Sequence, residues 1–192
     1  MTRDPIARFR RWLSHAQRAG IPLAETAALA TADATGRPSV RFVLLKQADA
    51  RGFVFYTNAR SRKGKELKQN PLASLAFCWN PLGKQVRVEG PVEVVAAAEA
   101  DAYWVTRPRD SQLAGLASTQ SAELARRSDL LARWRQLRRQ YDGQDIPRPA
   151  AWIGYRIIPQ RIEFWTLRDR RLHDRQLFVR GDNGWKWTLL QP

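Results

Sequence analysis

The sequence predicts a single α+β domain built on an antiparallel, barrel-like sheet with peripheral helices. Many short, alternating or apolar segments bounded by turn residues are typical of antiparallel strands. A helical section, from about residue 97 to 141, separates two groups of these segments, which favours an antiparallel barrel of α+β type. No linker, repeat or low-complexity stretch interrupts the chain, so residues 1–192 are expected to form one domain.

The first half of the chain is expected to contain one long helix, several strands and a short basic helix. The long helix has Asp4 as N-cap and Pro5 at its first position, and it ends at Gly20. Ser61 caps the short helix, which stops before Pro71. Strands are predicted over 28–33, 39–46, 52–58, 72–79 and 84–95, and the short helix over 62–69.

The second half is expected to be helical first and then to return to strands. Helices are predicted over 97–107, near Ser111 and over 123–141, and strands over 151–159, 161–168, 176–182 and 184–190. Asp182, Asn183 and Gly184 join the last two strands, and this turn sequence is a strong hairpin signal.

The chain is strongly basic, with a formal net charge of +15 and a pI near 11.2. Such a charge is compatible with nucleic-acid binding. However, the 27 arginines and 6 lysines are spread along the sequence, and no helix-turn-helix, zinc-finger or RNA-recognition motif is present. Phosphorylated small molecules explain the charge with fewer assumptions, so no nucleic-acid partner is expected.

Several classes of site and location are disfavoured by what the sequence lacks. No apolar run approaches the ~20 residues that cross a bilayer, and the N-terminal residues lack the apolar core of a signal peptide, so no membrane partner and a cytoplasmic location are expected. Two histidines and one cysteine, far apart in sequence, predict no metal site. Cys78 lies in an apolar run and is expected to be a buried structural thiol.

The familiar catalytic loops are also missing. There is no G-x-G-x-x-G, no Walker-type glycine loop and no G-x-S-x-G elbow. If the protein is an enzyme, an organic cofactor is expected to supply the difficult chemistry.

The segment over 163–175 carries one of the two histidines and four arginines within eight residues. Arg171 and His173 are two residues apart, so in an extended chain they project to the same side. A guanidinium beside an imidazole can bind an anion and handle a proton near neutral pH. A solvated basic loop is the alternative interpretation of this segment.

Further anion-binding groups occur in the first half of the chain. Arg41 and Lys46 flank an apolar strand, and their odd spacing points them to opposite faces unless the strand is distorted or they serve different groups. Exposed strand charges are the alternative. Arg62 and Lys63 follow Ser61 at a strand-to-helix junction, where free amides and cations form a phosphate cradle. Gln85, Arg87 and Glu89 share one polar face of their strand.

Taken together, these motifs resemble the pyridoxine/pyridoxamine 5′-phosphate oxidase family of flavin enzymes. The matching segments occur in family order from about Asp4 to the end: RFVLLK, GFVFYTNARSRKGKEL, KQVRVEGPVE, YWVTRPRDSQ, ASTQS, PRPAAWIGYRIIP, IEFW and RRLHDR. The resemblance implies an antiparallel split β-barrel of Greek-key type. It also implies a homodimer that binds FMN between its subunits.

The resemblance also implies roles for individual residues. FMN phosphate and ribityl contacts fall on Arg41, Arg62, Lys63, Gln120 and Ser121, with Lys46 at the end of the same strand. Flavin contacts fall on Tyr56, Thr57 and Gln85, and, from across the dimer, on Trp165 and Arg175. The substrate phosphate is assigned to Lys46, Tyr103, Arg107 and Ser111, and the catalytic positions over the pyridine ring to Arg171 and His173.

The implied reaction is oxidation of pyridoxamine or pyridoxine 5′-phosphate to pyridoxal 5′-phosphate, with oxygen reduced to hydrogen peroxide. Two departures from the family pattern stand out: AGLAS precedes Gln120, and the chain ends TLLQP. That ending resembles the related flavin oxidases of phenazine biosynthesis, which act on an unphosphorylated ring. A phenazine-type oxidase and a non-catalytic flavin-binding barrel are therefore the alternative hypotheses.

Overall fold

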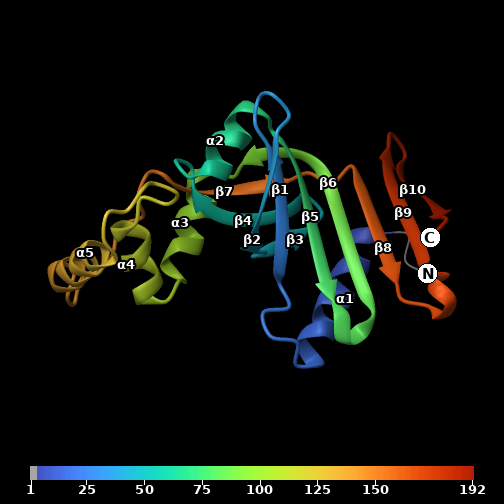
Figure 1. Ribbon diagram of the computed structural model, residues 1–192, viewed down its shortest axis with the longest axis horizontal. Coiled ribbons are helices and arrows are strands. Elements are labelled where there is room, and N and C mark those ends of the chain that lie inside the picture. Colours follow the sequence, from blue (N-terminus) through green and yellow to red (C-terminus); the bar gives the residue numbers. More distant parts are fainter. Residues whose placement is uncertain (1–3) are drawn as a thin grey trace.

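The computed structural model describes residues 4–192 and contains an antiparallel sheet that curls into a half-barrel (Figure 1). The α-helices are α1 (Pro5–Arg18), α2 (Arg62–Gln69), α3 (Ala97–Val105), α4 (Arg109–Ala117) and α5 (Arg127–Gln140). The strands are β1 (Thr26–Ala32), β2 (Pro38–Leu44), β3 (Gln47–Asp49), β4 (Gly52–Asn58), β5 (Leu72–Trp79), β6 (Lys84–Val94), β7 (Trp152–Ile157), β8 (Arg161–Thr166), β9 (Asp174–Gly181) and β10 (Gly184–Leu190). The predicted α+β split barrel is confirmed.

The long strand β6 joins the two parts of the sheet. Its first half pairs with β5 and β8, within the order β10-β9-β8-β6-β5-β1-β2. Its last residues, Val92–Val94, pair instead with β7, which continues to β4 and β3. Because one strand contributes to both parts, the sheet bends around a shared core.

Helix α1 closes one side of this core, and its sequence explains its position. Asp4 Oδ1 accepts a hydrogen bond from the Ile6 backbone N–H at 2.8 Å and so caps the helix as predicted. The apolar stripe of the helix places Phe9 against Phe53 and Phe77, with ring centroids 4.9 and 4.8 Å apart. Phe9 is fully buried, which ties the first helix to the sheet.

A second, smaller core lies beneath helices α3 to α5. These helices lie on the side of the molecule opposite to β9 and β10 (Figure 1). Trp104 and Trp152 pack edge to face in it, and the Trp104 indole N–H donates to the Ile146 carbonyl at 2.7 Å. This cluster fixes α3 against β7 and so positions the side chains of α3 that face the sheet.

The structure corrects four sequence expectations. Residues Gln47–Asp49, which fall between the strands predicted over 39–46 and 52–58, form the additional strand β3, whose residues pair with β4. Helix α5 begins at Arg127 rather than at residue 123, and β9 begins at Asp174 rather than at residue 176. Cys78 is exposed, so the prediction of a buried thiol was wrong. It lies at an outward position of β5, where burial alternates from residue to residue.

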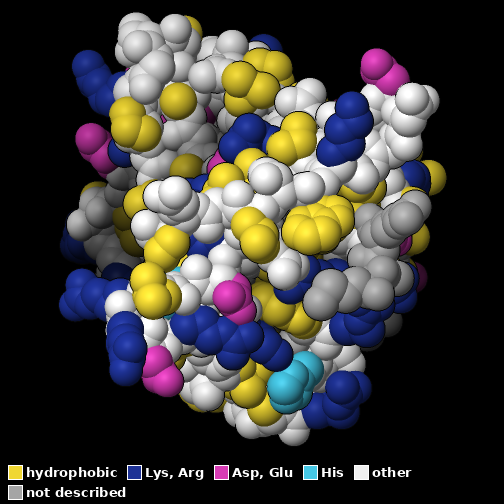
Figure 2. All heavy atoms as spheres, turned by 90° about the vertical axis from the view of Figure 1, so that its right-hand side faces the viewer, with side chains coloured by type: hydrophobic (Ala, Val, Ile, Leu, Met, Phe, Trp, Pro, Cys, Tyr) yellow, Lys and Arg dark blue, Asp and Glu magenta, His cyan; other side chains and the backbone are white. Residues whose placement is uncertain are grey.

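Basic side chains are distributed over the face that carries the last strands and α1. Figure 2 shows Lys and Arg side chains scattered there among hydrophobic ones, with few acidic side chains between them. No helix in the described part of the chain has the length and apolar character needed to span a bilayer.

Candidate active site

Two separate hollows contain most of the predicted site residues. The first half-site, about 420 Å³ in volume, is lined by seven of them: Lys46, Tyr56, Thr57, Lys63, Tyr103, Arg107 and Gln120. The second half-site, about 220 Å³, is lined by four more: Gln85, Trp165, His173 and Arg175. The predicted site residues therefore come together in the folded chain, but they form two separate groups rather than one.

Along the sheet, strands β1 and β5 lie between β2, which lines the first half-site, and β6, which lines the second. The first half-site lies beside β2 and β4, and the second lies on β6, β8 and β9. From β2 to β6 there are three strand spacings, or roughly 14 Å at about 4.8 Å each. Gln85 was grouped with Tyr56 and Thr57, but it lies in the second half-site, beside Trp165.

A buried ammonium group lines the first half-site. Lys63 Nζ donates to Thr57 Oγ1 and to Gln120 Oε1, each at 3.1 Å, and Thr57 Oγ1 donates to the same amide oxygen at 2.8 Å. The pKa of Lys63 is lowered to about 8, first by burial and then by the charge of Arg41, while the charge of Glu66 opposes both. This lysine is therefore still largely protonated at neutral pH.

Two more predicted cations, Arg41 and Arg62, meet at the buried Glu66 next to this lysine. Arg41 Nη2 lies 3.1 Å from Glu66 Oε2, and Arg62 Nε lies 2.8 Å from Glu66 Oε1. The odd spacing of Arg41 and Lys46 is explained here. Strand β2 ends at Leu44, so Lys46 lies beyond the strand and lines the hollow while Arg41 contacts Glu66.

In the same half-site, Arg107 is held between two indole rings. Its guanidinium lies 4.9 Å from the ring centroid of Trp104 and 4.8 Å from that of Trp152. Arg107 Nη1 is buried and has no hydrogen-bond partner among residues 4–192, which is costly unless a ligand supplies an acceptor. A Cβ on Gly115 would lie 3.3 Å from this nitrogen, so the glycine leaves room for the guanidinium.

Aromatic rings form one wall of the same hollow. Tyr56 stacks on Tyr103 with centroids 4.3 Å apart, and on Trp152 with centroids 5.0 Å apart. A Cβ on Gly154 would lie 2.7 Å from the Tyr56 ring, so this strand position must be glycine for the stack to form. The wall is flat and apolar, as a planar ring system requires.

In the second half-site a buried carboxylate binds two arginines. Glu163 accepts hydrogen bonds from Arg87 at 2.5 Å and from Arg175 at 2.7 Å. Burial raises the pKa of Glu163, but the hydrogen bond from Arg175 and the charge of Arg87 outweigh it, so its pKa is lowered. Arg175 also donates to the Gln191 carbonyl at 2.9 Å, which holds the C-terminal residues beside the hollow.

His173 has a defined orientation in this half-site. Its Nδ1 accepts a hydrogen bond from the Arg168 backbone N–H at 3.2 Å, so the neutral ring carries its proton on Nε2. Its ring lies 4.6 Å from that of Trp165. The premise that Arg171 and His173 lie in an extended segment was wrong, because Asp169–Arg171 forms a 3₁₀ turn. Arg171 is exposed and does not line the hollow.

Backbone strain marks the same regions. Within residues 4–192, the non-glycine residues with positive φ are Leu23 at 48°, Ser121 at 69°, Arg170 at 54° and Arg171 at 61°. Leu23 lines the first half-site, and Ser121 and Arg171 are predicted site residues. Such strain costs about 1–3 kcal/mol per residue and concentrates at functional sites. Ser111 is half-buried on α4 and does not line either hollow.

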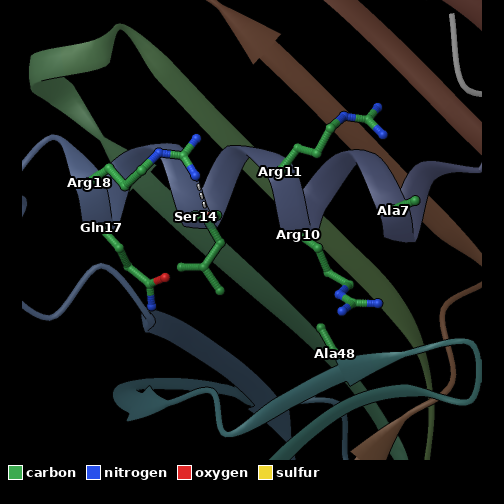
Figure 3. Close-up of a pocket in the computed structure, with 8 residues that line it drawn as sticks. Ala7, Arg10, Arg11, Ser14, Gln17, Arg18 and Ala48 are labelled. Atoms are coloured by element: carbon green, nitrogen blue, oxygen red, sulfur yellow. Dashed lines mark hydrogen bonds between the residues drawn. The ribbon is translucent and has the colours of Figure 1, made fainter.

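A further hollow, about 610 Å³ in volume, lies between α1 and β3 and contains no predicted site residue. Figure 3 shows Arg10, Arg11 and Arg18 projecting from the helix around it, with Arg18 donating to Ser14 at 2.9 Å.

Sequence reasoning missed four residues that shape the half-sites: Glu66, Trp152, Glu163 and Arg87 as a partner of Glu163. The signal for the last pair was available in part, since Arg87 lies on the polar face of its strand. Its cross-strand neighbour Glu163 could not be identified before the register of β6 and β8 was known.

Comparisons with known proteins agree with this architecture. Residues 13–165 match the family described as "Pyridoxamine 5'-phosphate oxidase", and residues 152–192 match "Pyridoxine 5'-phosphate oxidase C-terminal dimerisation region". The chain is 52% identical over 189 residues to the "Pyridoxine/pyridoxamine 5'-phosphate oxidase" of Anaeromyxobacter dehalogenans, covering 98% of this chain and 96% of that protein. Its identity to the protein of the same name from Gluconobacter oxydans is 50%, covering 98% and 94%.

Solved structures share the fold over the whole chain. PhzG from Burkholderia lata 383, in complex with tetrahydrophenazine-1-carboxylic acid, superimposes with a TM-score of 0.95 at 37% identity, covering 100% of this chain and 94% of that one. A pyridoxamine 5′-phosphate oxidase-related, FMN-binding protein from Nostoc punctiforme has a TM-score of 0.79 at 18% identity, covering 100% of both chains, which shows the fold alone. From the family matches and the full-length identities near 50%, the chain belongs to the pyridoxine/pyridoxamine 5′-phosphate oxidase family.

Proposed function

We propose that this protein uses FMN to oxidise pyridoxamine 5′-phosphate and pyridoxine 5′-phosphate to pyridoxal 5′-phosphate. Molecular oxygen is the final electron acceptor and is reduced to hydrogen peroxide. The amine substrate also consumes one water and releases ammonia. The observation that carries the proposal is the unpartnered, buried Arg107 Nη1 beside Lys46 and Tyr103, because it requires an acceptor such as a phosphate oxygen.

The remaining residues of the first half-site fit FMN. Lys63, Arg41 and Arg62 form a cationic group suited to the flavin phosphate, and Gln120 and Thr57 add polar groups for the ribityl chain. The flat wall formed by Tyr56 suits a flavin ring. The cationic group at Lys63 contacts Thr57 and Gln120, whereas Arg107 contacts Trp104 and Trp152. The two groups therefore have separate surroundings, and we assign one phosphate to each.

We further propose that the active site is shared between two subunits. The first half-site of one protomer would be completed by Gln85, Trp165, His173 and Arg175 of its partner. Three observations support this: the half-sites are separated within one chain, the C-terminal residues match a dimerisation region, and the apolar Val40 and Phe42 on β2 are 69% and 76% exposed.

In this mechanism the side chains bind, orient and exclude water. Lys46, Tyr103 and Arg107, which line the first half-site, hold the substrate phosphate, which supplies binding energy remote from the reacting carbon. Ser111, which does not line it, stays a predicted further contact. His173, with its Nε2–H, lies over the pyridine ring and fixes it, and Arg171, exposed on the adjacent 3₁₀ turn, would reach the ring from outside the hollow. Bound FMN would supply the hydride acceptor for the 4′ carbon. These residues therefore act by positioning and electrostatics rather than as a strong base.

A phenazine-type flavin oxidase is the second candidate. The superposition on PhzG at a TM-score of 0.95 favours it, as does the TLLQP ending. The residues Lys46, Tyr103 and Arg107, which converge on one hollow, favour a phosphorylated substrate instead. Oxygen uptake with each substrate class, on the same flavin-loaded preparation, separates the two functions.

The purified protein is expected to be yellow, dimeric and loaded with about one FMN per protomer, because both half-sites are needed to enclose the flavin. Light scattering gives the mass of the particle, and flavin released on denaturation gives the stoichiometry. A stable monomer that holds stoichiometric FMN would contradict the shared site.

The affinity for FMN is expected to fall as the pH rises above about 8, by up to about tenfold per unit, because the flavin phosphate requires protonated Lys63. The cause is not unfolding. The pKa of Lys63 is about 8 in the folded protein and 10.5 in the unfolded chain. Between these pH values the unfolded chain binds more protons than the folded protein, so the contribution of Lys63 to the free energy of unfolding increases as the pH rises.

Flavin fluorescence titrations from pH 7 to 10 measure this dependence. The matched control is Lys63→Arg, whose side chain stays charged throughout, and whose FMN affinity should be flat over the same range. An identical decline in wild type and Lys63→Arg would assign the pH dependence to another group.

A further inference from the structure

The side chain of Glu66 is buried among hydrogen-bond donors close to Lys63, which lines the first half-site. It is 6% exposed and lies on α2, one turn after Arg62. Its carboxylate accepts hydrogen bonds from Thr31, from Ser39 at 2.7 Å, from Arg62 at 2.8 Å and from Arg41 at 3.1 Å. Four donors from β1, β2 and α2 therefore converge on one carboxylate.

These contacts fix two arginines in different ways. Arg41 uses Nη1 for Leu29 O and Thr31 Oγ1, and Nη2 for Ser39 Oγ and Glu66, so its guanidinium plane is set. Arg62 is bound to Glu66 through Nε, which leaves its two terminal nitrogens available to an anion. An arginine that is already ordered loses less side-chain entropy when a ligand binds.

Glu66 also sets the charge of the cluster. Arg41, Arg62 and Lys63 carry three positive charges, and Glu66 reduces their sum to +2, which matches a phosphomonoester of charge about −1.5 to −2. Of the charges acting on Lys63, Arg41 lowers its pKa and Glu66 raises it. Glu66 thus keeps a buried ammonium protonated next to two guanidinium groups.

We propose that Glu66 is a positioning residue for the flavin phosphate, which holds Arg41 and Arg62 in their binding orientations and preserves the charge of Lys63. The inference rests on the proposed FMN site and adds to it a carboxylate that does not touch the ligand. The competing explanation is that Glu66 is a buried ion pair that only joins α2 to the sheet.

The second half-site offers a matched control. Glu163 has the same 6% side-chain exposure and also binds two arginines, Arg87 and Arg175, but it lies away from Lys63. Both carboxylates are therefore equivalent as structural ion pairs. Only Glu66 is next to the cationic group that we assign to the phosphate.

The test compares FMN with riboflavin, which lacks the phosphate, in fluorescence titrations of wild-type, Glu66→Gln and Glu163→Gln apoprotein. Glu66→Gln is expected to weaken FMN binding at least about tenfold, equivalent to about 1.4 kcal/mol, and riboflavin binding less than about twofold. Glu163→Gln is expected to weaken both flavins by the same factor. The melting temperature of each of the three proteins, measured without flavin, controls for an effect of the substitution on folding.

A Glu66→Gln variant that loses affinity for both flavins equally, or for neither, would overturn the proposal. So would a phosphate-selective loss of the same size in Glu163→Gln. If Glu66→Gln does not fold, Glu66→Asp keeps the charge but cannot reach both arginines, and should show the same selective loss.

The pH dependence gives a second readout that a structural ion pair would not change. In Glu66→Gln the pH at which FMN affinity begins to fall should move below that of wild type, since the carboxylate no longer supports Lys63. An unchanged pH dependence would contradict the effect on Lys63. If the wild-type protein bound FMN no more tightly than riboflavin, the FMN-phosphate site itself would be refuted. If Glu66→Gln kept the wild-type preference for FMN over riboflavin, only the role of Glu66 would be refuted.

Discussion

The Arg107→Leu variant is expected to lose at least about tenfold in kcat/KM for pyridoxamine 5′-phosphate while its FMN content stays that of wild type. Each charge-assisted hydrogen bond to the phosphate contributes roughly 1.5–3 kcal/mol, and 1.4 kcal/mol corresponds to a factor of ten. Burial lowers the pKa of Arg107, but a guanidinium is not deprotonated in proteins, so Arg107 remains charged. Steady-state rates and the flavin absorbance of the same samples measure both quantities.

Arg109→Leu is the matched control for this change. Arg109 lies two residues further along the chain and donates to the carbonyls of Gln144 and Tyr141, outside the hollow. It should alter stability but not kcat/KM. Loss of FMN from Arg107→Leu, with unchanged efficiency of the remaining holoenzyme, would assign this arginine to the flavin phosphate instead.

A heterodimer of two defective protomers is expected to regain about half of the wild-type activity, although each parent homodimer is nearly inactive. One protomer carries Arg107→Leu, in the first half-site. The other carries His173→Asn, in the second half-site, and Arg171→Leu, on the turn beside it, and this pair is expected to lower kcat/KM at least about a hundredfold. If each site combines half-sites from both chains, the heterodimer contains one intact site and one doubly defective site.

Co-expression with two different tags and sequential purification isolates this heterodimer. The control is a heterodimer in which one protomer carries all three substitutions and the other is wild type. It has two singly damaged shared sites and should be nearly inactive. If instead each site were formed within one chain, the control would be half active and the first heterodimer nearly inactive.

The sequence predicted the helices and most strands, because these depend on local patterns, whereas the roles assigned to the site residues came from the family resemblance and stay predictions. The capped helix at Asp4, the strand alternation and the hairpin at Gly184 need only neighbouring residues. Cys78 shows the limit of this reasoning. Its apolar run predicts burial for every residue, but alternation along β5 buries Phe77 and Trp79 and exposes the thiol between them.

The contacts that organise the half-sites could not be predicted, since they join distant parts of the chain. Glu66 binds Arg41 across 25 residues, and Glu163 binds Arg87 across 76. Trp152 stacks on Tyr56 because β7 pairs with β4, a register that the sequence does not reveal. The separation of the predicted residues into two half-sites has the same origin.

The most direct test of the proposed function is an oxygen-uptake assay on the FMN-loaded protein with pyridoxamine 5′-phosphate. We expect one pyridoxal 5′-phosphate and one hydrogen peroxide to form for each oxygen consumed, and unphosphorylated pyridoxamine to be a much poorer substrate. If the protein with FMN fully bound consumed no oxygen with either pyridoxamine or pyridoxine 5′-phosphate, the proposal would be contradicted. If that protein then oxidised a reduced phenazine carboxylate, the second candidate function would be established.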